Sequence, residues 1–92
     1  MPTFIVERHL PGISEEQLVA AATRAKRTTA QMTEEGTPIR YLFSNFIPGE
    51  ERCFCLFEGP TVDAVRRANE RAQIPFERIL AALHVSSDDL QV

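Results

Sequence analysis

Cys53-Phe54-Cys55-Leu56-Phe57-Glu58 is a short apolar run between the turn residues 48–51 and the breaker pair Gly59-Pro60. Its length, its aromatic content and its flanking residues predict a β-strand that is apolar on both faces. An exposed edge strand cannot have this composition. We therefore expect the strand at the centre of a sheet, with a covering layer on each of its faces.

The two cysteines, Cys53 and Cys55, are separated by one residue, so their side chains leave the strand on the same face. A disulfide between them would be strained, because their Cα atoms lie about 6.5–7 Å apart on an extended strand. We expect free thiols that pack as small residues against a helix. A metal-binding or redox pair is the alternative.

Residues 3–9, upstream of this run, are rich in β-branched and aromatic side chains and predict a strand that ends before Pro11-Gly12. Its alternation places Phe4, Val6 and Arg8 on one face and Ile5, Glu7 and His9 on the other. Ser14 and Gln17 then form a capping-box pattern, which predicts the start of a long helix over residues 15–33. Much of the inner face of that helix is alanine, so we expect it to lie close over Cys53 and Cys55.

The helix is predicted to end at Glu34-Glu35-Gly36, with Pro38 preventing its continuation. Residues 39–47 predict a second strand, which returns through the turn at 48–51 into the central strand. Its alternation places Tyr41, Phe43, Asn45 and Ile47 on one face. Thr61 predicts the cap of a second helix that ends before Pro75, and residues 76–85 are interpreted as a last strand.

The element order β-α-β-β-α-β predicts a ferredoxin-like α+β sandwich, a four-stranded antiparallel sheet with two helices on one face. We expect the first and third strands in the middle, running parallel to each other. One domain is predicted over residues 1–85, followed by a flexible C-terminal tail over 86–92. Because the second face is too apolar to lie in water, we expect a homodimer of the dimeric α/β barrel type, joined through the open sheet faces.

The charge balance of 10 Lys+Arg against 13 Asp+Glu gives a net charge of -3, without a basic stripe. This argues against nucleic acid as a partner. No apolar run reaches the length of about 18 residues that a transmembrane helix needs. We expect a cytoplasmic protein that binds neither nucleic acid nor a membrane.

Four motifs together resemble a known family of small ferredoxin-like domains of unknown function, which includes actinobacterial nickel-binding proteins. They are Phe4-x-Val6-Glu7-Arg8-x-x-Pro11-Gly12, Tyr41-x-x-Ser44-x-Phe46, Cys55-Leu56-Phe57-Glu58-x-Pro60 and Ile74-Pro75-x-x-x-Ile79. The resemblance implies a dimeric α/β fold and, in some members, divalent nickel held by histidines. In the second helix and toward the last strand, where those members carry histidines, this chain has Ala68, Asn69, Ile74 and Leu80. His9 and His84 are its only histidines.

The face turned away from the helices carries the candidate site residues in the predicted register. We expect the ligand-binding side chains to be Glu7, Tyr41, Asn45, Phe54 and Glu58. A nitrogen and oxygen donor set suited to nickel or another divalent metal would be Glu7, His9 and Glu58. The alternative is that Glu7 pairs with Arg8, and Glu58 with Arg52, in ordinary ion pairs.

Three functional hypotheses follow from these residues. The first is a small dimeric binding protein that holds a divalent metal ion or a small apolar ligand in the cavity between the paired sheets. The second is a dimeric α/β barrel enzyme that uses Glu7 or Glu58 as a general base on a hydrophobic substrate. The third is a non-catalytic interaction or regulatory module. No phosphate-binding or nucleophile motif decides between them.

Overall fold

The computed structural model describes the whole chain from Met1 to Val92 and contains the predicted order of elements. These are β1 (Thr3–His9), α1 (Glu15–Glu34), β2 (Arg40–Ile47), β3 (Arg52–Glu58), α2 (Val62–Arg71), β4 (Arg78–Ala82) and a short 3-10 helix (Ser87–Asp89). The ferredoxin-like α+β fold is therefore confirmed. The last strand is confirmed in type but is shorter than the predicted range 76–85.

The four strands form one sheet in the order β2-β3-β1-β4. Neighbouring strands all pair antiparallel, including β1 with β3 in the middle. The prediction that these two strands run parallel is wrong. The long helix α1 returns the chain so that β2 has the direction of β1, and the tight hairpin then reverses β3 against both.

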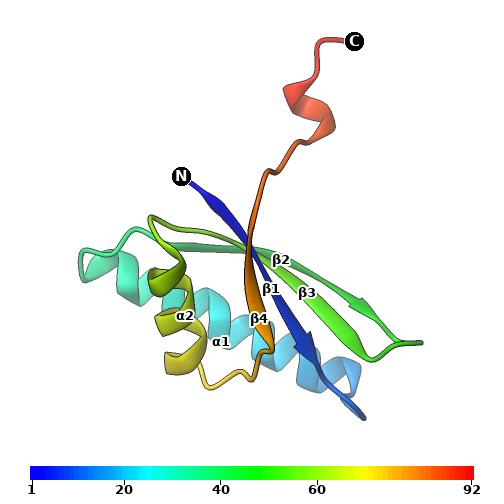
Figure 1. The fold of residues 1–92 in the computed structure, drawn as a ribbon. Coiled ribbons are helices and arrows are strands. Elements are labelled where there is room, and N and C mark those ends of the chain that lie inside the picture. The colour runs from blue at the N-terminus through cyan, green and yellow to red at the C-terminus, as the bar shows by residue number, and fades with distance from the viewer.

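Both helices pack on the same face of the sheet (Figure 1). The core between the layers is built from short side chains of the helices and from the alternate side chains of β1 and β3. Its members include Ala25, Met32, Ala64, Val65, Ala68, Phe4, Val6, Cys53, Cys55 and Phe57. Alanine on the inner faces of the helices allows them to lie close to the sheet, as the sequence indicated.

Local caps explain where the helices begin and end. The Ser14 hydroxyl accepts a hydrogen bond from the Gln17 amide, and the Gln17 side chain accepts one from the Ser14 amide, which completes the capping box. Gly36 follows α1 with a φ of 107°, which an L-residue rarely adopts. At the second helix, the Thr61 hydroxyl accepts a hydrogen bond from the Ala64 amide.

A β-bulge in β2 changes the face on which Tyr41 lies. Tyr41 is opposite Phe57, but Phe43 is opposite Leu56, so one extra residue of β2 lies between them. Because each extra residue inverts the alternation, Tyr41 shares the helix-covered face with Ser44, whereas Phe43 and Asn45 lie on the open face. The prediction that Tyr41 lies on the open face is wrong.

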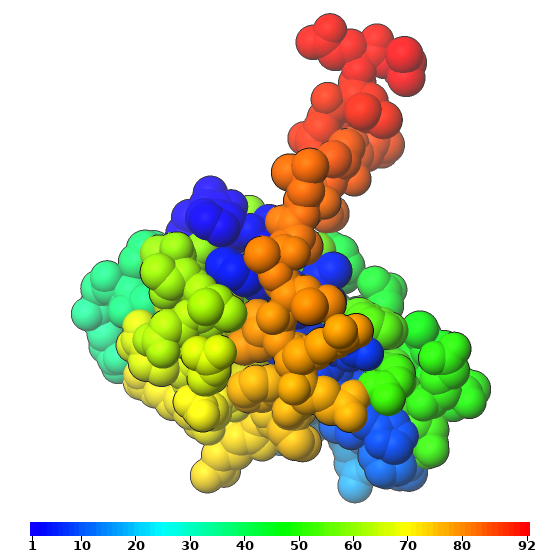
Figure 2. Space-filling view, in the orientation of Figure 1, coloured from blue at the N-terminus to red at the C-terminus, as the bar shows by residue number.

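The C-terminal residues leave the end of β4 and stand away from the body of the molecule (Figures 1 and 2). Their apolar side chains Leu83, Val85, Leu90 and Val92 are exposed. Neither of the two helices combines the length and the apolar composition needed to cross a bilayer.

The close approach of α1 to the sheet gives a test of the packing. Ala25 is buried and lines the contact of α1 with Cys53 and Cys55. We expect Ala25→Leu to lower the free energy of unfolding by about 1–3 kcal/mol, because the added methyl groups have no space. Urea denaturation measures this change. Ala30→Leu, on the exposed side of the same helix, is the control and should change stability little.

Candidate functional site

The open face of the sheet carries an apolar surface that no helix covers. Phe43 is 40% exposed and Leu80 is 38% exposed, although both lie on strands of the sheet. Ile5 and Leu56 lie between them in the register. Ile5, Phe43, Ile47, Phe54, Leu56 and Leu80 define what we call the open-face patch.

Glu7 is the one nearly buried carboxylate of the open face, with an exposure of 8%. Its Oε2 atom accepts a hydrogen bond of 2.6 Å from Arg78 Nε on β4, and its Oε1 atom accepts one of 3.4 Å from Arg52 on β3. Arg52 also pairs with Glu77, and this contact lowers the pKa of the Glu77 carboxyl. Glu7 is therefore held between two guanidinium groups and is not a free base.

Glu58 lies at the opposite end of the face and does not join Glu7. Glu7 is opposite Phe54 in the register, and Glu58 is four residues further along β3, a separation of about 13 Å at the usual rise per residue. Glu58 pairs instead with Arg40, at 3.3 Å. Both carboxylates therefore form ion pairs, as the alternative interpretation predicted, but with different arginines. Glu7 pairs with Arg52 and Arg78 instead of Arg8, and Glu58 pairs with Arg40 instead of Arg52.

The predicted metal donors Glu7, His9 and Glu58 do not come together within one chain. His9 is exposed at the end of β1, and His84 lies beyond β4 with its ring 6.2 Å from the ring of Phe43. Nowhere in the chain do three His, Cys, Asp or Glu side chains gather closely enough to hold a metal ion. The side chains of a single chain therefore do not fit nickel.

Two of the other predicted ligand-binding residues lie where they were expected. Asn45 and Phe54 are directly opposite each other on the open face. Tyr41 lies beneath α1, where its ring meets Phe57 edge-on at 5.4 Å and its hydroxyl is 2.6 Å from Ser44 Oγ. Burial raises the pKa of the Tyr41 hydroxyl. Tyr41 cannot contact a ligand bound to the open face.

A polar cluster lies on the helix-covered face, inside the core. The Cys55 sulfur is 2.9 Å from Ser44 Oγ and 3.6 Å from the Cys53 sulfur, and it accepts a hydrogen bond of 3.3 Å from Arg8 Nε. Both cysteines are free thiols. The hydrogen bond that joins the two sulfurs and the nearby charge of Arg8 lower the pKa of Cys55 to about 6. The same hydrogen bond raises the pKa of Cys53.

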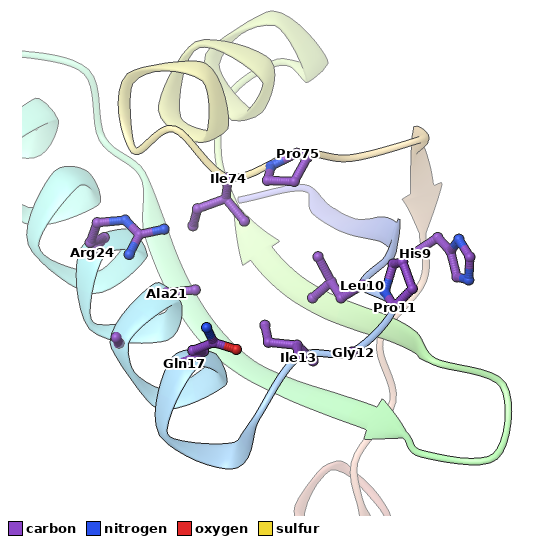
Figure 3. A pocket seen from close by; sticks show the side chains of 11 residues that line it. His9, Leu10, Pro11, Gly12, Ile13, Gln17, Ala21, Arg24, Ile74 and Pro75 are labelled. Carbon is purple, nitrogen blue, oxygen red and sulfur yellow. The ribbon is translucent and has the colours of Figure 1, made fainter.

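An open groove of about 570 Å³ lies beside this cluster, between the loop after β1, the first turns of α1 and the segment before β4 (Figure 3). Gln17 and Arg24 reach into it from α1, opposite Leu10 and Ile74, whereas the His9 ring points away. Leu10, Ala21 and Ile74 also line the small cavity at the thiols, so the groove and the cavity share a wall.

Sequence reasoning missed the partners of the two charged residues in β1. Arg52 and Arg78 were not assigned to Glu7, because their strands come opposite β1 only in the folded sheet. Arg8 was placed correctly on the core face with Phe4 and Val6. A guanidinium on an apolar face was the available signal that a polar partner lies there.

Comparisons with known proteins agree with the fold. A family model described as "Nickel responsive protein SCO4226-like" matches residues 4–81. A search of curated proteins finds no match. The crystal structure of SCO4226 from Streptomyces coelicolor A3(2) superimposes with a TM-score of 0.74 at 24% sequence identity, over 91% of this chain and 99% of that chain.

The family match includes all four motifs on which the resemblance was based, and that prediction is confirmed. The matched residues extend from β1 into β4 and contain both helices. This chain therefore belongs to the SCO4226-like family of nickel responsive proteins.

Proposed function

We propose that this protein is a homodimeric binding protein whose two open sheet faces meet and enclose a space for a small ligand. The observation that carries the proposal is the open-face patch. Large apolar side chains are exposed there, while both helices lie on the other side of the sheet. Burial of such a patch against a second copy is the usual way in which a domain of this size removes it from water.

The chemistry of the open-face patch favours a small ligand with an apolar body. The apolar surface comes from Phe43, Phe54 and Leu80. Asn45, opposite Phe54, adds a side-chain amide beside this surface. Glu7 is already neutralised by Arg52 and Arg78. This geometry gives no support to the alternative in which Glu7 acts as a general base. A cytoplasmic location stays a prediction.

The family description links the protein to nickel, and we propose that any nickel site uses side chains of both copies. One chain brings no three suitable donors together. A pair of faces related by two-fold symmetry would double each donor that lies near the symmetry axis.

Leu80→Glu tests the dimer. Leu80 belongs to the open-face patch and lies opposite Ile5, on the edge strand β4. We expect the carboxylate to leave a folded monomer, because an unpaired charge buried between two copies costs about 3–5 kcal/mol, which raises the dissociation constant by about a hundredfold or more. Sedimentation velocity at micromolar concentration measures the change.

Val19→Glu is the matched control, because Val19 is an exposed apolar residue on α1. It should leave the dimer intact. A wild-type protein that sediments as a monomer at micromolar concentration would contradict the proposal, and so would a Leu80→Glu variant that remains a dimer.

Calorimetric titration with Ni²⁺ tests the shared metal site. We expect binding heat with the wild-type protein and with Val19→Glu, and none with the monomeric Leu80→Glu variant, because one chain has too few donors. Equal heats in all three proteins would contradict a site shared between copies. Absence of heat in the wild type would contradict the nickel site. It would not affect the proposed dimer with its apolar ligand space, which the sedimentation experiment tests independently.

A further inference from the structure

Arg8 is a buried cation without a carboxylate. It is 2% exposed, and every ion pair in the structure is made by another arginine. A guanidinium stays protonated in proteins, so burial cannot neutralise it by loss of a proton. A buried charge requires an opposite charge or a full set of hydrogen bonds. Its hydrogen bonds go to Cys55 Sγ and, at 3.4 Å, to the carbonyl oxygen of Pro75.

The group that can balance this charge is the sulfur of Cys55. The groups that face it differ by element: β1 supplies Arg8, β2 supplies Ser44 and Tyr41, and β3 supplies Cys53. The α1 residues at the same cavity carry no titratable group; they are Leu18, Ala21, Ala22 and Ala25. No carboxylate lies among these neighbours. Arg8, Ser44 and Cys53 are each within hydrogen-bonding distance of the Cys55 sulfur and can donate to it.

We propose that Cys55 is a thiolate ion-paired with Arg8, and that it forms a modification site for hydrogen peroxide. The site lies on the helix-covered face, opposite the proposed ligand space, and does not depend on the proposed function. It also differs from the donor set considered for nickel.

Space and access select a small oxidant. The cavity at Cys53 and Cys55 measures about 10 Å³, room for roughly one water molecule. It shares the lining residues Leu10, Ala21 and Ile74 with the open groove, so these residues separate the two spaces. Hydrogen peroxide has two oxygen atoms, so it is the smallest peroxide, and a small movement of the lining side chains would admit it. Bulky organic peroxides do not fit this cavity.

The reaction balances without a further reactant. The Cys55 thiolate attacks one oxygen of hydrogen peroxide, an S–O bond forms and the O–O bond breaks. The sulfur is oxidised to sulfenic acid, whose oxygen keeps the proton it had in the peroxide, and the second oxygen leaves as hydroxide, which the buffer neutralises. Arg8 Nε and the Ser44 hydroxyl, at 3.3 Å and 2.9 Å from the sulfur, are placed to stabilise the charge on the oxygens during this step.

Cys53 lies 3.6 Å from the Cys55 sulfur, but the product is expected to remain sulfenic acid. The two residues are separated by one position on a regular strand of the sheet. A disulfide at that spacing is strained, since the Cα atoms lie about 6.5–7 Å apart. Cys53 instead donates its hydrogen bond to the thiolate.

The test treats the folded full-length protein with hydrogen peroxide across a pH series. Catalase then removes the oxidant, and unfolding in urea with dimedone traps sulfenic acid for mass spectrometry. Cys53→Ser keeps a hydroxyl donor and leaves one cysteine in the tryptic peptide, so the modified residue is unambiguous. We expect one oxygen on Cys55, with a rate that rises with pH around a midpoint near pH 6, because protonation below that pH removes the thiolate.

Arg8→Met tests the ion pair, with Arg67→Met as the control because Arg67 is exposed on α2. Without the cation, the midpoint should move up by at least about one pH unit. At pH 6 a shift of one pH unit should lower the oxidation rate about twofold, because a roughly fivefold loss of thiolate is partly offset by a roughly threefold gain in nucleophilicity. Arg67→Met should match the wild type.

Two results would overturn the proposal and need only the wild-type protein, in case Arg8→Met does not fold. The first is a midpoint at or above pH 8 in the folded protein, the behaviour of an ordinary thiol. The second is the absence of oxygen on Cys55 in the folded protein under conditions that oxidise the urea-unfolded chain.

Discussion

The sheet of this protein has two faces, and the chain supplies helices for only one of them. On the covered face, alanines and cysteines keep the layers close together, and the core there is well buried. On the open face, Phe43, Ile47 and Leu80 remain about two-fifths exposed. The same strand β3 contributes to both faces through alternate residues, which explains its nearly continuous apolar composition.

The second organising feature is the pair of charged neighbours Glu7 and Arg8 in β1. They have opposite charges and adjacent positions, yet they cannot pair, because consecutive side chains of a strand point to opposite faces. Each finds its partner across the sheet on its own face. Glu7 binds Arg52 and Arg78, and Arg8 binds Cys55. Strand β1 thus contributes to a polar network on each face of the sheet.

The family assignment and the donor geometry give different information about nickel. The family model matches most of the chain and carries the description nickel responsive. The side chains of one copy, however, are arranged for ion pairs rather than for metal coordination, since the carboxylates of Glu7 and Glu58 are engaged by arginines. The donors for a bound nickel ion would therefore have to come from more than one copy of the chain.

The element types and most of their boundaries followed from local features of the chain. The capping box at Ser14, the glycine at 36, the hairpin residues after Ile47 and the alternation in β1 and β3 act over a few residues, and so they can be read without the fold. The family resemblance also came from short motifs. Arg8 on the core face and Asn45 and Phe54 on the open face were placed by the same alternation.

Features that depend on contacts between residues distant in the chain could be identified only in the folded structure. The antiparallel pairing of β1 with β3 follows from two reversals of direction, and the bulge that moves Tyr41 beneath α1 is visible only in the register of β2 against β3. The arginine partners of Glu7 and the contact between Arg8 and Cys55 join positions 45 to 71 residues apart. Local sequence carries periodicity and turn preference, but which side chains meet across a sheet is set by strand order and register, and these are properties of the whole fold.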